Sequence, residues 1–500
     1  MSRSRAFLGW LEDKSDWLSP IVVKEVRQLV RTREFNASFA GSVVAGLAVA
    51  FFGAADALAG SGTSGRWTFG ALMGCLAILG LAVVPLGAFS MLRNERMEQT
   101  LELITLTALS QRRVVIGKLL AQAVKLATLF AAVAPFIAMS FLLGGIDFGT
   151  ILLSLLALFM WSLWACALCL FFSTLFKSRA VSGLVFGVVG IVLFVVFGLS
   201  RTLFMVARMG GSPLAAFGVT GSRSWWWVLA ITTTFCLATM ANLVLLAENR
   251  LSLPTENRVT RLRVGFLVQF LLIAGWTLTF IDHPVRVRTG AIEALAVFGG
   301  LHLAVVAIFT VTEDLAVPRR VRLRMKVSSR WNWLLTMFRP GGGRGAVYVL
   351  AQMVVMLCAA RLLGAKWMEL RWLLTMCGYI CFFTGVPTLA FRSLRPARDA
   401  TLHLRVAVLL LLACSTLLPD IIHYLLWQPD VLNLSFSSRH LLNPFRTLAN
   451  WTQVEARAWF EIPVAMGLAG FFSYLALIQM GARTIEEPIS IDPHISAVEA

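Results

Sequence analysis

The chain contains a series of apolar runs, most about 20 residues long, separated by shorter polar segments. A helix of that length crosses roughly 30 Å of hydrocarbon, and inside a bilayer a helix satisfies its own backbone hydrogen bonds. The composition agrees, since 58% of the 500 residues are hydrophobic and only 14% are charged. The runs therefore predict an all-α, polytopic membrane protein, and they exclude a soluble enzyme, a secreted disulfide scaffold and a disordered chain.

We interpret twelve runs as membrane-spanning helices in a six-plus-six layout. The expected regions are a cytoplasmic tail (1–34), a first six-helix bundle (35–263), a second six-helix bundle (264–480) and a cytoplasmic C-terminal tail (481–500). The halves are similar in layout and not in residues, which leaves open whether the second is a degenerate copy of the first. The predicted spans are 36–57, 67–92, 119–143, 149–173, 179–200, 225–247, 264–282, 291–312, 346–363, 371–391, 404–427 and 457–480.

The positive charges predict the orientation of these spans. With the N-terminus in the cytoplasm, about 30 of the 44 Lys and Arg residues fall in inner segments, which is the bias that cytoplasmic loops show. This bias accounts for the net charge of +18 without a nucleic-acid partner. We therefore predict a multi-pass protein of the cytoplasmic (inner) membrane, in contact with the lipid bilayer and with both termini inside.

A polar segment before the first span has the pattern of a short amphipathic helix. Ser19 is a good N-cap and Pro20 a good first helical residue. Val22, Val26 and Leu29 recur at helical spacing, and basic residues occupy other faces. A basic amphipathic helix of this kind lies in the membrane surface rather than crossing the bilayer; the alternative is a plain cytoplasmic tail.

A second segment, residues 94–113, lies on the inner side between spans two and three. Met97, Leu101, Ile104 and Leu109 would form one apolar face and leave the charged residues exposed. A short cytoplasmic helix joined rigidly to two spans can transmit force from a soluble partner.

These two segments together resemble the type-2 ABC transporter permeases. That family has a pattern close to E-x-x-G-T-L-E-L-L-L-x-T-P-L-S, followed by a Gly-Lys-Leu entry into the third span. It also has an opening NP-x-x-x-KE-x-RQ segment, which residues 19–28 resemble. Gln99 replaces the usual Gly and Ala108 the usual Pro, and the similarity covers about residues 17–145. The matching residues are Glu98, Thr100, Leu101, Glu102, Leu103, Thr107, Leu109 and Ser110, then Gly117, Lys118 and Leu119.

The resemblance implies a division of labour between this chain and a partner. It implies an elbow helix (Pro20, Lys24, Glu25, Arg27 and Gln28), six spans per unit, and a coupling helix that contacts a separate ATPase (Glu98, Thr100, Glu102, Thr107 and Ser110). The expected partner is a dimer of ABC ATPase subunits, which would hold ATP and Mg²⁺, and a second permease chain is left open. The chain itself is then expected to be no enzyme and to bind no cofactor.

The nearest candidates for a phosphate-binding or a metal-binding motif lack residues that such sites need, which agrees with that expectation. Residues 60–67 have the glycine spacing of a phosphate-binding loop, but Arg66 and Trp67 stand where Lys and a hydroxyl residue are needed. Cys166 and Cys169 form a CxxC inside an apolar run with no second Cys or His pair nearby, so we interpret them as packing residues. The Gly-rich residues 341–345 are interpreted as a flexible entry to span nine.

A few polar residues fall inside the predicted spans. His302 lies near the middle of span eight, and Asp420 and His423 lie three residues apart in span eleven. A central charge costs about 2.5–3.5 kcal/mol on insertion scales, which makes such residues candidates for a transport pathway; a packed neutral His is the alternative.

Two other function classes remain as alternatives. Twelve spans in a six-plus-six layout is also the plan of secondary, ion-coupled transporters, although residues 93–113 lack the basic Gly- and Asp-containing motif usual there. An integral membrane enzyme is weaker, because the chain has neither HExxH nor a Gly-x-Ser-x-Gly elbow.

Overall fold

A computed structural model describes residues 20–60, 64–97, 111–144, 148–175, 187, 190, 223–252, 257, 259–315, 336–394, 401–427, 438–451, 454 and 459–486. In this part of the chain every regular element is helical, and eleven helices are long and apolar enough to cross a membrane. These eleven coincide with eleven of the predicted spans, and the remaining one, 179–200, lies almost wholly outside the described residues.

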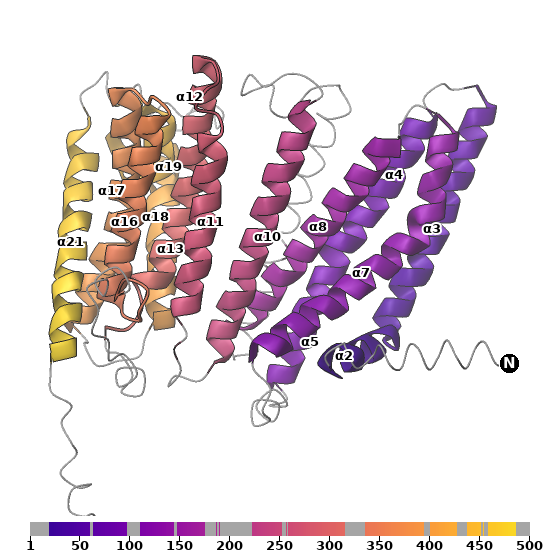
Figure 1. Cartoon of the computed structure of the whole chain (residues 1–500), viewed down its shortest axis with the longest axis horizontal. Coiled ribbons are helices and arrows are strands. Elements are labelled where there is room, and N and C mark those ends of the chain that lie inside the picture. The colour runs from indigo at the N-terminus through magenta and orange to yellow at the C-terminus, as the bar shows by residue number, and fades with distance from the viewer. Residues whose placement is uncertain are drawn as a thin grey trace, which may run out of the picture. The chain divides into compact units, whose positions relative to one another are not determined.

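The chain divides into two compact units, residues 1–252 and 253–500. In the first unit, the second span is one continuous helix in which α4, a π-helical segment and α5 follow one another (Figure 1). The helices are α2 (Pro20–Val30), α3 (Arg33–Leu58), α4 (Ser64–Ile78), the π-helix η1 (Leu79–Val83), α5 (Val84–Met97), α7 (Gln111–Leu142), α8 (Phe148–Ser173) and α10 (Arg223–Leu251).

The core of the first unit forms where the second span packs against α7 and α8. Leu72, Leu76 and Phe89 of the second span are fully buried there, beside Val133 of α7 and Ala165 of α8. The short helix α2 lies across one end of this bundle (Figure 1) and packs mainly against α7. The long helices are therefore held together by apolar contacts along their length, and α2 covers one end.

The second unit has the same kind of helical bundle. The predicted boundary at residue 263 falls inside its first span, α11, so Arg263 belongs to a helix and not to a linking loop. The elements are α11 (Thr260–Leu278), α12 (Val285–Ala294), the π-helix η3 (Leu295–Gly299), α13 (Gly300–Thr310), α16 (Gly342–Leu362), α17 (Trp367–Leu394), α18 (Thr401–Trp427), the 3₁₀-helix η4 (Ser438–Leu442), α19 (Pro444–Ala449) and α21 (Glu461–Glu486).

The glycines at 341–345 are packing residues, which corrects their interpretation as a flexible entry. Gly341, Gly342 and Gly343 are buried, and Gly341 has a φ of +126°, which favours glycine. A Cβ on Gly342 would lie 2.6 Å from the carbonyl oxygen of Glu313, and one on Gly345 would collide with that of Thr310. The run therefore lets the start of α16 approach the end of α13 closely.

Glycines also bring α17 and α21 together, and one of them gives a direct test of this contact. We expect Gly470→Ala to destabilise the second unit by about 1–3 kcal/mol, the usual cost of overpacking, because its Cβ would collide with the backbone nitrogen of Phe382. Gly275→Ala is the matched control, since nothing lies within 4 Å of its added Cβ and Ala is the better helix former. Thermal unfolding in detergent compares the two; equal stabilities would contradict close packing at Gly470.

Candidate functional site

Lys118 joins three helices at one end of the first unit. The helix α7 begins at Gln111, so Lys118 lies in its second turn, one residue before the predicted span. Its Nζ lies 3.1 Å from Oε1 of Glu25 in α2 and 2.7 Å from Oε1 of Glu95 in α5. The Lys118 side chain is fully buried and Glu25 is 2% exposed. We refer to these three residues as the Lys118 cluster.

The amphipathic pattern of α2 explains how Glu25 reaches this position. Val22, Glu25 and Leu29 recur at three- and four-residue intervals and are buried, so they form one face of the helix. Lys24, Arg27 and Gln28 lie on the exposed side. A buried charge is costly unless it is paired, so the contact with Lys118 is the condition under which Glu25 can lie on the packed face of α2.

The polar face of α7 continues beyond Lys118. Gln122 and Lys125 follow at helical spacing and are 2% and 5% exposed. The Gln122 amide donates to Sδ of Met91 over 3.7 Å. Lys125 Nζ lies 3.7 Å from the position of a Cβ built on Gly87, and a Glu34 carboxylate oxygen lies 3.9 Å from the same point. The absence of a side chain at Gly87 therefore leaves room for the oppositely charged groups of Lys125 and Glu34.

The sequence-predicted coupling residues fall outside the described part of the chain. These are Glu98, Thr100, Glu102, Thr107 and Ser110. The residues on either side of this segment are described, and the Lys118 cluster connects them. Glu95 precedes the segment and Lys118 follows it. Of the predicted elbow residues, Pro20 begins α2 and Glu25 enters the cluster.

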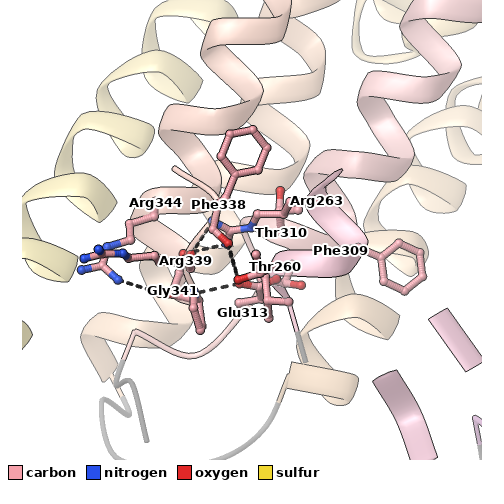
Figure 2. A network of polar contacts seen from close by, with 12 residues as sticks. Thr260, Arg263, Phe309, Thr310, Glu313, Phe338, Arg339, Gly341 and Arg344 are labelled. Carbon is pink, nitrogen blue, oxygen red and sulfur yellow. Dashed lines mark hydrogen bonds and ion pairs between the residues drawn. The ribbon is translucent and has the colours of Figure 1, made fainter. Parts of the chain in front are cut away.

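The second unit has a buried ion pair of its own, which Figure 2 shows. Nη2 of Arg263 in α11 lies 2.6 Å from Oε2 of Glu313, which lies just beyond the end of α13 at Thr310. The same guanidinium donates to the carbonyl oxygens of Met337, Arg339 and Gly341 at 2.6, 2.7 and 3.1 Å. Arg263 is completely buried. We refer to this arrangement as the Arg263 cluster.

Further contacts hold α16 on α11 and fix the segment that follows α13. The Tyr348 hydroxyl of α16 donates to the Arg263 carbonyl oxygen over 2.6 Å, and Arg392 of α17 pairs with Asp314 at 2.5 Å. Burial raises the pKa of the Glu313 carboxyl above its usual value, and the positive charges of Arg263 and Arg405 oppose that rise. A buried ion pair of this kind is weak evidence for net stability, and its contacts define the geometry of this segment.

His302, predicted as a pathway residue, is 5% exposed within α13. Its ring stacks on Phe270 with centroids 5.8 Å apart and meets the edge of Phe266, an arrangement typical of a packed imidazole. Asp420 and His423 belong to α18, but their side chains are outside the described part. Among the described residues, no group of three or more His, Cys, Asp or Glu side chains could hold a metal ion.

Sequence reasoning missed the pairings of both clusters. Lys118 was known as part of a motif, whereas Glu95, Arg263 and Glu313 carried no signal beyond being charged residues next to predicted spans. Comparison of the chain with protein-family models, with curated proteins and with solved structures found no match.

Proposed function

We propose that this chain is the transmembrane permease subunit of a type-2 ABC transport system that exports a substrate across the cytoplasmic membrane. In this proposal twelve helices form two groups of six, and both termini lie in the cytoplasm. A dimer of separate ATPase subunits binds ATP and Mg²⁺ and supplies the energy. The chain carries the transport pathway, for which His302, Asp420 and His423 are the candidate polar residues, and performs no catalysis.

The observation that carries the proposal is the Lys118 cluster. The resemblance was based on an elbow segment, a coupling segment and a Gly-Lys-Leu entry, and Glu25 of the elbow lies 93 positions before Lys118 of the entry. Lys118 of the entry pairs with Glu25 of the elbow and with Glu95 just before the coupling segment. A network that fixes both ends of residues 98–110 is what a force-transmitting segment requires, since a load on it then moves α2, α5 and α7 together.

The mechanism follows from this linkage. Closure of the ATPase dimer on ATP would displace the coupling segment, and the paired ends would pass that displacement to the second and third spans. ATP shifts the bundle between inward and outward states only if the closed dimer binds one state more tightly. The charged residues Glu98 and Glu102 are then the points at which the ATPase surface is recognised.

Reversing these two charges tests the proposal. We expect Glu98→Lys with Glu102→Lys to lower substrate-stimulated ATP hydrolysis and transport by about tenfold or more, because like charges placed across an interface cost several kcal/mol. Hydrolysis and uptake are measured in proteoliposomes that contain the chain and its co-purified ATPase. Thermal unfolding of the chain alone should be unchanged. Glu461→Lys is the control, since it reverses an exposed charge at the start of α21, on the predicted outer side.

The same preparation distinguishes the proposed ABC permease from the alternative, a secondary transporter. Substrate movement that is driven by a proton or sodium gradient, in vesicles without any ATPase, would contradict the ABC proposal. ATP-dependent movement that is insensitive to such gradients supports it.

A further inference from the structure

Both units contain a π-helix at the same place in their topology. In each unit the second span is a single continuous helix with a π-helical segment near its middle. This segment is η1 (Leu79–Val83) in the first unit and η3 (Leu295–Gly299) in the second. Each π-helical segment is five residues long. Well under 1% of residues in proteins are π-helical, and such turns are rarely retained without a packing or functional reason. Two of them in matching spans therefore indicate a shared origin better than apolar helices do.

A glycine within the first π-helix and one directly after the second pack against the fourth span of their own units. A Cβ on Gly80 would collide with the Ser162 hydroxyl of α8, and a Cβ on Gly300 would collide with the Met376 sulfur of α17. These glycines thus let the second and fourth spans approach closely in both units, although the residues that meet there differ.

Several pairs of packed helices in one unit have a counterpart in the other. In the first unit, α3 packs on α4 and α7, α5 packs on α7 and α8, and α10 packs on α7 and α8. In the second unit, α11 packs on α12 and α16, α13 packs on α16 and α17, and α21 packs on α16 and α17. Within each unit the third and fourth spans also touch, as α7 with α8 and α16 with α17. The counterpart of α18 would be the predicted span 179–200, which lies almost wholly outside the described residues.

The ion-pair clusters occupy matching positions as well. The second span of each unit ends near a glutamate, Glu95 or Glu313, and each glutamate pairs with a fully buried cation. The cation comes from the third span in the first unit and from the first span in the second. In the second unit the third span instead supplies Tyr348, which bonds to the backbone of Arg263. In both units a buried ion pair therefore holds the end of the second span to its neighbours, although the helices that supply the partner residues differ.

From these correspondences we infer that the second unit is a degenerate copy of the first, so that one chain supplies both membrane halves of the transporter and accepts two ATPase subunits. The two-ATPase part depends on the proposed function. Residues 313–345 then occupy the place in the second unit that residues 93–113 occupy in the first.

The composition of the intact complex tests this inference. The full chain carries an affinity tag at its C-terminus, is purified in nanodiscs from its own host, and is weighed together with co-eluting subunits by native mass spectrometry. We expect one chain with two copies of an ATPase. Two chains with two ATPases would overturn the inference and leave the proposed function standing, as would one chain with a single ATPase. Particles without any ATPase would overturn the proposed function and the two-ATPase assignment together.

A functional measurement determines the number of chains independently of mass. Wild-type chains and the transport-deficient Glu98→Lys, Glu102→Lys variant are co-expressed in varied proportions, and transport is measured against the wild-type fraction. Activity that falls in direct proportion to that fraction indicates one chain per transporter, as we expect. Activity that falls as its square would show that two chains are needed, and would overturn the inference.

Discussion

Replacing Lys118 with Met is expected to destabilise the protein by about 3–5 kcal/mol, the usual cost of removing one partner from a buried ion pair. Lys118 pairs with both Glu25 and Glu95, and Glu25 is only 2% exposed. Its loss leaves the buried carboxylate of Glu25 without this partner in a packed junction. Chemical or thermal unfolding in a mild detergent measures the loss.

A matched surface variant and a compensated variant isolate the cause. Lys24→Met removes a lysine from the exposed side of α2 and should change stability by no more than about 0.5 kcal/mol. Adding Glu25→Gln and Glu95→Gln to Lys118→Met removes every charge of the cluster and should restore most of the lost stability. If Lys118→Met costs no more than Lys24→Met, the cluster does not hold α2, α5 and α7 together.

The compensated triple variant also separates folding from coupling. It should fold, yet it lacks the charged contacts that fix both ends of residues 98–110. Under the proposed function, ATP hydrolysis by the bound ATPase would then persist while ATP-driven transport falls. Transport at the wild-type rate would show that the cluster serves stability alone.

The positions of the spans could be predicted from the sequence because the bilayer imposes them. A run of about 20 apolar residues has no other way to satisfy its backbone in hydrocarbon, so hydropathy alone located eleven of the described helices. The positions of the helix ends were predicted less accurately, and the reason is physical. Hydropathy excludes Lys118 and Arg263 from their spans because it scores the residue and not its partner, although both are fully buried within helices.

The candidate site depends on contacts that a single sequence does not encode in its local pattern. Lys118 and Glu25 are separated by 93 positions, and Arg263 and Glu313 by 50. The resemblance drew attention to the elbow and entry segments, but nothing in their spacing indicated that they touch. The π-helices were missed for a related reason, since the sequences LGLAV and LAVFG are ordinary apolar stretches whose widened turn is set by the packing of neighbouring helices.

Arg263→Met is expected to be the most damaging single change in the second unit, at about 3–5 kcal/mol from the stranded Glu313 carboxylate alone. The arginine also satisfies three backbone carbonyls, those of Met337, Arg339 and Gly341, and water would have to replace each of those bonds. Arg263→Lys keeps the charge and loses the fork of donors. Because lysine presents a single compact ammonium, it cannot reach all of these oxygens, and we expect about 2–4 kcal/mol from the lost charge-assisted bonds.

The reciprocal change should be much milder, and this asymmetry is the sharper part of the prediction. Burial already raises the pKa of Glu313, so the neutral form is less disfavoured there than at the surface. Glu313→Gln keeps an acceptor for Arg263 and should cost about 1–2 kcal/mol. Unfolding measurements on the three variants should rank Arg263→Met above Arg263→Lys and Arg263→Lys above Glu313→Gln. Equal losses for Arg263→Met and Glu313→Gln would mean that the ion pair, and not the carbonyl contacts seen in Figure 2, determines the stability of this end of the unit.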